Sequence, residues 1–179
     1  FKTKKEAKLG KNLTLTGMMG VGKTTIGKNL AKKLRYKFVD VDKLIEAREG
    51  SSISFIFKNK SESYFRKIET EITLAELKKN NSVISLGGGA FLNNIIRKSA
   101  KKLSISFWLD VQIDELIRRL KKNNQRPLLL KKNIAETAKK IYFDRKKIYN
   151  EADYRINCDS LKSDKIVHKI LDLYEKSRN

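Results

Sequence analysis

The 179-residue sequence contains little cysteine or proline and no long apolar run, and each scarcity excludes a class of protein. The one cysteine, Cys158, excludes an internal disulfide framework and favours a reducing compartment, so we expect a cytoplasmic protein. No apolar run approaches the roughly 20 residues of a membrane span, and residues 1–12 are too polar for a secretory signal. The chain has no Pro/Gly-rich linker, which predicts a single domain over residues 1–179.

Acidic residues are also few, because 20 Asp and Glu stand against 41 Lys and Arg, for a formal net charge of +21. A strongly basic surface attracts polyanions, so a non-catalytic nucleic-acid-binding module is one alternative function. Much of the excess, however, is lysine in scattered pairs, and no stretch interleaves aromatic with basic residues as a base-stacking surface would. We therefore interpret the lysines as a solvated surface and predict neither nucleic-acid nor membrane binding.

Short apolar runs alternate along the chain with apolar residues spaced by three or four. The runs predict five strands, at residues 13–16, 38–41, 82–86, 105–109 and 154–157. The spacing predicts helices from residue 23 and over about 65–75, 113–120, 134–142 and 166–173. This alternation predicts an α/β fold with three layers, in which helices cover both faces of a five-stranded parallel sheet. In such a sheet, ligands bind beyond the carboxyl ends of the strands.

The first predicted strand runs into Gly17–Thr24, whose sequence GMMGVGKT matches the phosphate-binding pattern G-x-x-x-x-G-K-[ST]. Its glycines allow backbone N–H groups to converge on phosphate oxygens, and the next helix points its positive end at the same place. We expect Lys23 to reach the β- and γ-phosphates of ATP and the Thr24 hydroxyl to hold Mg²⁺. The predicted nucleotide contacts also include Gly20, Val21, Gly22 and Thr25. The motif predicts a P-loop nucleotide-binding fold but does not identify the acceptor.

Two carboxylates, Asp40 and Asp42, end the second predicted strand. Side chains two apart on a strand face the same side, so both are expected to project into the ligand crevice. Asp40 would support the Mg²⁺ shell, and Asp42 would orient or deprotonate an acceptor hydroxyl. The alternative is that Asp42 only caps a helix beginning at Lys43.

The third predicted strand ends at three glycines, Gly87, Gly88 and Gly89, which leave no side chain between a ligand and the backbone. A flexible turn is the alternative. Arginine is favoured over lysine where planar, bidentate contact with carboxylate or phosphate is needed. Arg66 and Arg145 are candidates for such contact, although a single arginine is more often a surface residue.

Taken together, these pieces resemble the shikimate kinases from Thr16 to about Asn157. The motifs that carry the resemblance are Gly17–Thr25, Asp40–Asp42, Phe65–Glu69, Leu86–Ala90, Arg126–Leu129, and Arg145 before Tyr149. The resemblance implies a nucleoside-monophosphate-kinase-like fold and transfer of the γ-phosphate of ATP to the 3-hydroxyl of shikimate. That reaction is a step of chorismate and aromatic amino-acid biosynthesis.

The resemblance also implies roles for individual residues. Asp42 would hold and activate the ring hydroxyls, Arg66 and Arg145 would clamp the carboxylate, and the Gly88 backbone would pack against the ring. Residues 43–79 would form the shikimate-binding helical segment. The pattern departs from the family only slightly, with Thr24 where serine is commoner.

On the nucleotide side, the resemblance implies a lid over residues 121–133 that brings Arg126 onto ATP as a third catalytic residue beside Lys23 and Asp42. Arg119 would stack near the adenine, and the loop 159–163 would close its other side. Ser163 stands where proline is often found, which leaves the adenine contacts open.

The remaining candidates are given structural roles. We expect His168 on the surface, Trp108 and Cys158 in the core, and Glu62 and Glu69 as solvated charges, although Glu69 could orient a nearby arginine. Another P-loop kinase, acting on gluconate, a nucleoside monophosphate or a polynucleotide 5′ end, is the nearest alternative. Those kinases lack the combined arginine and triple-glycine pattern. Nothing in the sequence requires more than a monomer.

Overall fold

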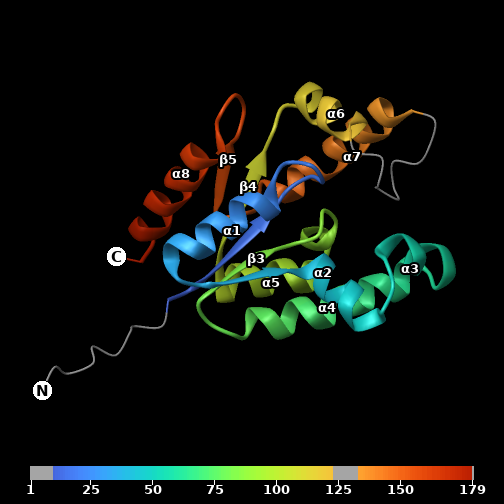
Figure 1. The fold of residues 1–179 in the computed structure, drawn as a ribbon, viewed down its shortest axis with the longest axis horizontal. Coiled ribbons are helices and arrows are strands. Elements are labelled where there is room, and N and C mark those ends of the chain that lie inside the picture. Colours follow the sequence, from blue (N-terminus) through green and yellow to red (C-terminus); the bar gives the residue numbers. More distant parts are fainter. Residues whose placement is uncertain (1–9, 123–132, 179) are drawn as a thin grey trace, which may run out of the picture.

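The computed structural model of the chain describes residues 10–122 and 133–178 (Figure 1). Within these ranges one sheet is formed by β1 (Asn12–Thr16), β2 (Lys37–Asp40), β3 (Ser82–Ser85), β4 (Ser104–Asp110) and β5 (Tyr154–Asn157). All neighbouring strands are parallel, and their order is β2-β3-β1-β4-β5. The predicted five-stranded parallel sheet is confirmed.

The helices within the described residues are α1 (Lys23–Leu34), α2 (Val41–Glu49), α3 (Ile53–Asn59), α4 (Glu62–Leu77), α5 (Asn94–Leu103), α6 (Ile113–Lys121), α7 (Ile134–Tyr149) and α8 (Ser163–Lys176), with a 3₁₀ turn η1 (Ala90–Leu92). The chain crosses from β1 to β2 in one direction along the sheet, and from β2 to β3, β3 to β4 and β4 to β5 in the other. Because such crossovers are right-handed, α1 lies on one face and α4, α5 and α7 on the opposite face. The last helix, α8, packs beside α1 (Figure 1). These are the predicted three layers.

The central strands are covered on both faces. Every residue of β1 and β4 is buried, as expected for a parallel sheet between two helical layers. Asn12 satisfies its buried amide by donating from Nδ2 to the carbonyl of Leu77 at 3.1 Å and accepting at Oδ1 from the Ser82 N–H at 2.9 Å. This side chain therefore joins the end of α4 to the start of β3. The predicted core positions Trp108 and Cys158 are both buried, at 1% exposure each.

Two details of the predicted elements are wrong. The second strand ends at Asp40, and Val41 is already the first residue of α2, because the Asp40 carboxylate accepts from the Lys43 N–H at 3.3 Å and caps the helix. Asp42 therefore lies in the first turn of α2, neither at a strand end nor in a capping position. The sequence prediction also omitted α3 and α5. Helix α5 begins after Asn93, whose side chain accepts from the Ile95 N–H at 2.9 Å.

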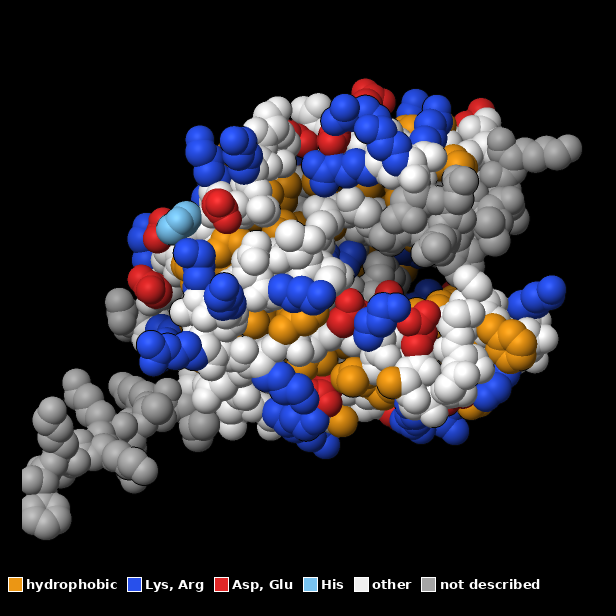
Figure 2. Space-filling model, viewed as in Figure 1, with side chains coloured by type: hydrophobic (Ala, Val, Ile, Leu, Met, Phe, Trp, Pro, Cys, Tyr) orange, Lys and Arg blue, Asp and Glu red, His pale blue; other side chains and the backbone are white. Residues whose placement is uncertain are grey.

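The lysine pairs within the described residues lie mainly on exposed positions of the helices and turns, and Figure 2 shows Lys and Arg side chains spread over the face it displays. His168 is exposed on α8, as predicted. Within the described ranges, no helix combines the length and the apolar character that a membrane crossing requires.

Candidate active site

A cleft of about 600 Å³ opens at the carboxyl ends of β1, β2 and β3. Figure 2 shows the molecule hollowed above the part formed by α2, α3 and α4. The predicted site residues that line the cleft are Gly20, Gly22, Lys23, Thr24, Thr25, Asp40, Asp42, Arg66, Gly87, Gly88, Gly89, Arg119 and Arg145. The structure therefore gathers one site from segments more than a hundred residues apart.

The phosphate loop joins β1 to α1. Gly20 and Gly22 have φ angles of 83° and 100°, a backbone conformation that favours glycine. Gly22 caps α1 without a side-chain hydrogen bond, and the first turn of α1 carries no acidic residue. No capping carboxylate therefore occupies the N–H groups of that turn, and they suit an anionic ligand. The Lys23 ammonium lies over the loop and donates to the carbonyls of Gly17 at 2.7 Å and Met18 at 2.9 Å.

The Thr24 hydroxyl donates to Asp40 Oδ2 at 3.2 Å, which joins the start of α1 to the end of β2. Among the described residues, no three His, Cys, Asp or Glu side chains gather as a metal cage. A hydroxyl and a carboxylate at the mouth of a phosphate loop suit Mg²⁺, which takes few protein ligands and keeps waters and phosphate oxygens. The geometry thus fits the predicted metal residues.

None of the three glycines after β3 has a positive φ, and two of them, Gly87 and Gly89, are needed for space. A Cβ atom on Gly87 would lie 2.8 Å from Asp42 Oδ1 and 2.9 Å from Glu69 Oε1. A Cβ atom on Gly89 would lie 2.6 Å from the Arg66 Nη2 atom. Gly87, Gly88 and Gly89 form what we call the glycine turn. Asp42 of α2 and Arg66 of α4 pack against this turn.

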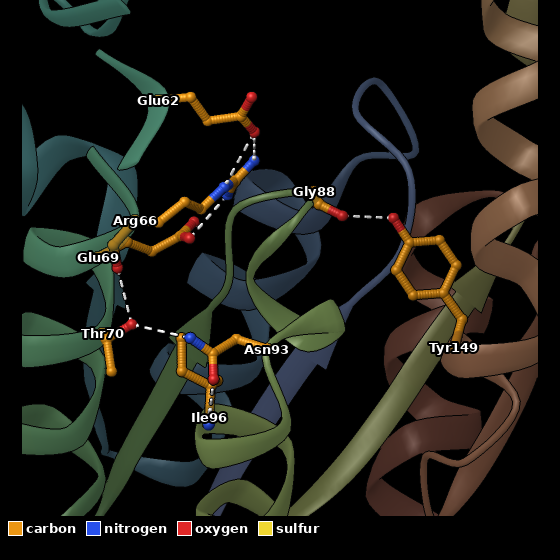
Figure 3. Close-up of polar contacts among 8 residues, drawn as sticks. All are labelled: Glu62, Arg66, Glu69, Thr70, Gly88, Asn93, Ile96 and Tyr149. Atoms are coloured by element: carbon orange, nitrogen blue, oxygen red, sulfur yellow. Dashed lines mark hydrogen bonds and ion pairs between the residues drawn. The ribbon is translucent and has the colours of Figure 1, made fainter. Parts of the chain in front are cut away.

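Arg66 lies between two acids of its own helix (Figure 3). It contacts Glu69 Oε2 at 2.7 Å and Glu62 Oε1 at 3.3 Å. Burial works against the charge of Arg66, but the charges of Glu69 and Glu62 outweigh that effect and raise its pKa. The guanidinium is thus fixed in direction and stays cationic. Its partial exposure, 27%, leaves it open to the cleft.

The interpretation of Glu69 as a solvated charge is wrong, since the residue is 1% exposed. Burial raises the pKa of the Glu69 carboxyl above its ordinary value, and the charge of Arg66 offsets only part of that effect. Its Oε1 atom has no hydrogen-bond partner among the described residues. The spacing of Arg66 and Glu69, three apart on a helix, was visible in the sequence. The glycine turn that buries Glu69 comes from a distant segment and was not.

Arg145 reaches the cleft from α7, whereas Arg66 reaches it from α4. A Cβ atom on Gly88 would lie 3.5 Å from Arg145 Nη1, so this guanidinium also packs on the glycine turn. Its Nη1 atom is buried and has no hydrogen-bond partner within the described ranges. A buried, unsatisfied cationic donor facing a cleft is suited to an anionic ligand.

The remaining nucleotide-side predictions are placed as follows. Arg119 of α6 contacts Glu115 Oε1 at 2.8 Å. The Nη1 atom of Arg119 lies 3.5 Å from the carbonyl oxygen of Val21. Val21 itself has a buried side chain, so its predicted contribution is through the backbone. Arg126 and most of the predicted lid, 121–133, lie outside the described residues.

Sequence reasoning missed the apolar wall of the cleft. Ile53 and Phe57 of the unpredicted helix α3 line it together with Phe65 of α4. The two phenylalanine rings pack with centroids 4.8 Å apart. This wall suits a ligand that has an apolar face as well as charged groups.

Comparison with known proteins identifies relatives of this fold and site. The family model described as shikimate kinase matches residues 19–175. A shikimate kinase from Sulfurihydrogenibium sp. is 45% identical over 163 residues, which are 90% of this chain and 96% of the relative. The solved shikimate kinase from Acinetobacter baumannii in complex with shikimate is similar with a TM-score of 0.90 at 30% identity, over 94% of each chain. The shikimate kinase from Aquifex aeolicus gives a TM-score of 0.82 at 35% identity, over 93% of this chain and 97% of that one.

Proposed function

The chain belongs to the shikimate kinase family, and from this premise we propose how its cleft phosphorylates shikimate. It is an ATP-dependent kinase whose acceptor is a hydroxyl of shikimate. We assign the 3-hydroxyl as that acceptor. One observation carries the assignment of residues: a phosphate loop, a carboxylate and two arginines from separate segments line the same cleft.

A coupled assay of ADP release tests the function directly. Shikimate, gluconate, quinate and nucleoside monophosphates are offered in parallel with ATP. Only shikimate is expected to support rapid turnover. Faster turnover with gluconate or with a nucleotide would overturn the assignment of the acceptor.

On the donor side, the phosphate loop holds ATP through backbone N–H groups, and Lys23 neutralises charge on the transferring group. Phosphoryl transfer depends mainly on positioning and charge neutralisation. The Thr24 hydroxyl and the Asp40 carboxylate would hold Mg²⁺, which would supply positive charge to the phosphates of ATP. The 3.2 Å hydrogen bond from the Thr24 hydroxyl to Asp40 Oδ2 supports the assignment of both residues to one metal site.

On the acceptor side, shikimate is an anionic ring carrying hydroxyl groups. Arg66 and Arg145 lie against the neighbouring residues Gly89 and Gly88 of the glycine turn and would bind the carboxylate between them. Asp42, packed on Gly87, would accept the proton of the attacking hydroxyl. The Gly88 backbone and the apolar wall would support the ring.

Arg66→Lys is expected to raise the KM for shikimate while the KM for ATP stays close to that of the wild type. A point charge does not reproduce the planar fork, and loss of a charge-assisted hydrogen bond weakens binding about tenfold or more. Initial rates with each substrate varied in turn measure the effect. Arg48→Lys is the matched control, because Arg48 pairs with Glu71 on the surface. Equal increases in both KM values would contradict the assignment of Arg66 to shikimate.

Arg126→Ala is expected to lower kcat on the order of a thousandfold, the effect of removing an arginine that stabilises charge in phosphoryl transfer. The role of Arg126 is proposed from the family motif alone, since the residue lies outside the described ranges. Rapid-quench measurement of the chemical step checks it. A variant that changed only the melting temperature would show that the proposed lid role is wrong.

We also propose that the enzyme acts as a monomer in the cytoplasm. The single cysteine is buried, and burial raises the pKa of its thiol to about 12, which fits a packing role. Sedimentation in the presence of ATP and shikimate tests the oligomeric state.

A further inference from the structure

Tyr149, the last residue of α7, is a fully buried tyrosine that contacts the glycine turn. Its hydroxyl donates a hydrogen bond to the carbonyl oxygen of Gly88 (Figure 3). Burial raises the pKa of the Tyr149 hydroxyl, so the group keeps its proton and remains a donor. Tyr149 does not itself line the cleft, whereas Gly88 and Gly89 do.

The direction of the Gly88 carbonyl decides the direction of the next N–H group. The described part of the chain contains no cis peptide bond, and in a planar trans peptide the C=O and the following N–H point in opposite directions. Figure 3 shows Tyr149 on one side of Gly88 and Arg66 on the other. With its carbonyl turned toward Tyr149, the Gly88–Gly89 peptide therefore turns the Gly89 N–H toward the side of Arg66.

We propose that Tyr149 is a positioning residue for the acceptor: its hydroxyl fixes the Gly88 carbonyl so that the Gly89 N–H faces the cleft as a donor to an oxygen of shikimate. The inference rests on the proposed function, because it names the ligand as shikimate. The same helix carries Arg145 four residues earlier, on the same face. One helix thus supplies a cation for the acceptor and the anchor of the backbone beside it.

If the role of Tyr149 were only structural, it would depend on the packing of its ring and not on its hydroxyl. The Tyr149 ring packs on Trp108 with centroids 6.0 Å apart, and the hydroxyl lies 4.0 Å from the Met18 sulfur. Tyr149→Phe keeps the ring and removes only the hydroxyl. The variant therefore separates packing of the ring from hydrogen bonding by the hydroxyl. Because the hydroxyl also interacts with the Arg145 guanidinium, the spectroscopic test on the glycine turn separates an effect through the Gly88 carbonyl from one through Arg145.

Tyr149→Phe is expected to raise the KM for shikimate about tenfold, the usual effect of losing one well-placed hydrogen bond to a ligand. The kcat and the KM for ATP should stay near their wild-type values. Tyr142→Phe is the matched control: Tyr142 is also buried on α7, its hydroxyl donates to Asp110 Oδ1 at 3.0 Å, and it lies outside the cleft lining. That variant should lose stability but keep the KM for shikimate.

An unchanged KM for shikimate in Tyr149→Phe, or an equal rise in Tyr142→Phe, would overturn the proposal. Failure of the wild-type protein to use shikimate would instead overturn the proposed function, so the two failures are distinguishable.

A spectroscopic test does not depend on turnover. The chain has nine glycines, and only Gly87–Gly88 and Gly88–Gly89 are adjacent pairs. Glycine labelled with ¹³C at the carbonyl and ¹⁵N at the amide therefore yields two carbonyl-to-amide correlation signals. In Tyr149→Phe, the Gly88 carbonyl signal should move upfield because it loses its donor, and the Gly89 amide should respond less to added shikimate than in the wild type. Unchanged signals would overturn the proposal, even for a variant too unstable for kinetics.

Discussion

Lys23→Ala is expected to lose nearly all turnover, with kcat falling on the order of a thousandfold, as when a preorganised donor to developing charge is removed. The ammonium sits over the phosphate loop, 2.7 Å from the Gly17 carbonyl and 2.9 Å from the Met18 carbonyl. Those contacts direct it at the position of the β- and γ-phosphates. The coupled ADP assay with shikimate measures kcat.

The control for this variant is Lys28→Ala, on the exposed side of the same helix. It removes the same side chain from α1 without touching the cleft and should keep wild-type kcat. Thermal unfolding of both variants separates loss of chemistry from loss of fold. A Lys23→Ala enzyme that turned over shikimate at near wild-type rate would show that the loop is not the catalytic phosphate site.

Asp42→Asn is expected to lower kcat by about a hundredfold to a thousandfold, the range for removing a general base. The amide has the same shape as the carboxylate, so packing on Gly87 is retained while the proton acceptor is lost. The KM for ATP should change little, because Asp42 lies against the glycine turn on the acceptor side. Single-turnover measurement with saturating shikimate isolates the chemical step.

Asp172→Asn, on the exposed side of α8, is the matched control and should behave as the wild type. A comparable loss of kcat in both variants would point to a general effect of charge. If Asp42→Asn retained its kcat and only bound shikimate more weakly, Asp42 would be a binding residue and not the base.

The sheet and most helices could be predicted because their signals are local. Buried parallel strands are continuous apolar runs, and each of the five predicted strands lies within a residue of its observed bounds. Helix α5 was missed although Asn93 caps its start, because only Ile96 and Ala100 of this helix are buried and its apolar pattern is short. Asp42 was misplaced because alternation of aspartates fits a strand as well as the first turn of a capped helix.

The site was less predictable where it depends on packing between distant segments. The phosphate loop could be recognised because all its groups lie within one stretch of backbone. The role of Gly87 and Gly89 as space for Asp42, Glu69 and Arg66 depends on α2, α4 and the end of β3 meeting in three dimensions. Glu69 is an ordinary acid on a helix until that meeting buries it. Tyr149 belongs to one of the family motifs, but no pattern in the sequence assigns a role to its hydroxyl.

The route of the chain through the sheet has a consequence for attempts to re-engineer the acceptor. Residues 41–81, between β2 and β3, and the glycine turn supply the acid, one arginine and the apolar wall, so most groups on the acceptor side lie close together in the sequence. Arg145 is encoded outside this segment, on a helix that follows β4. Grafting the corresponding segment of another kinase onto this scaffold would leave Arg145, the proposed carboxylate-binding arginine, in place, so we expect a change of acceptor to require two exchanges made together.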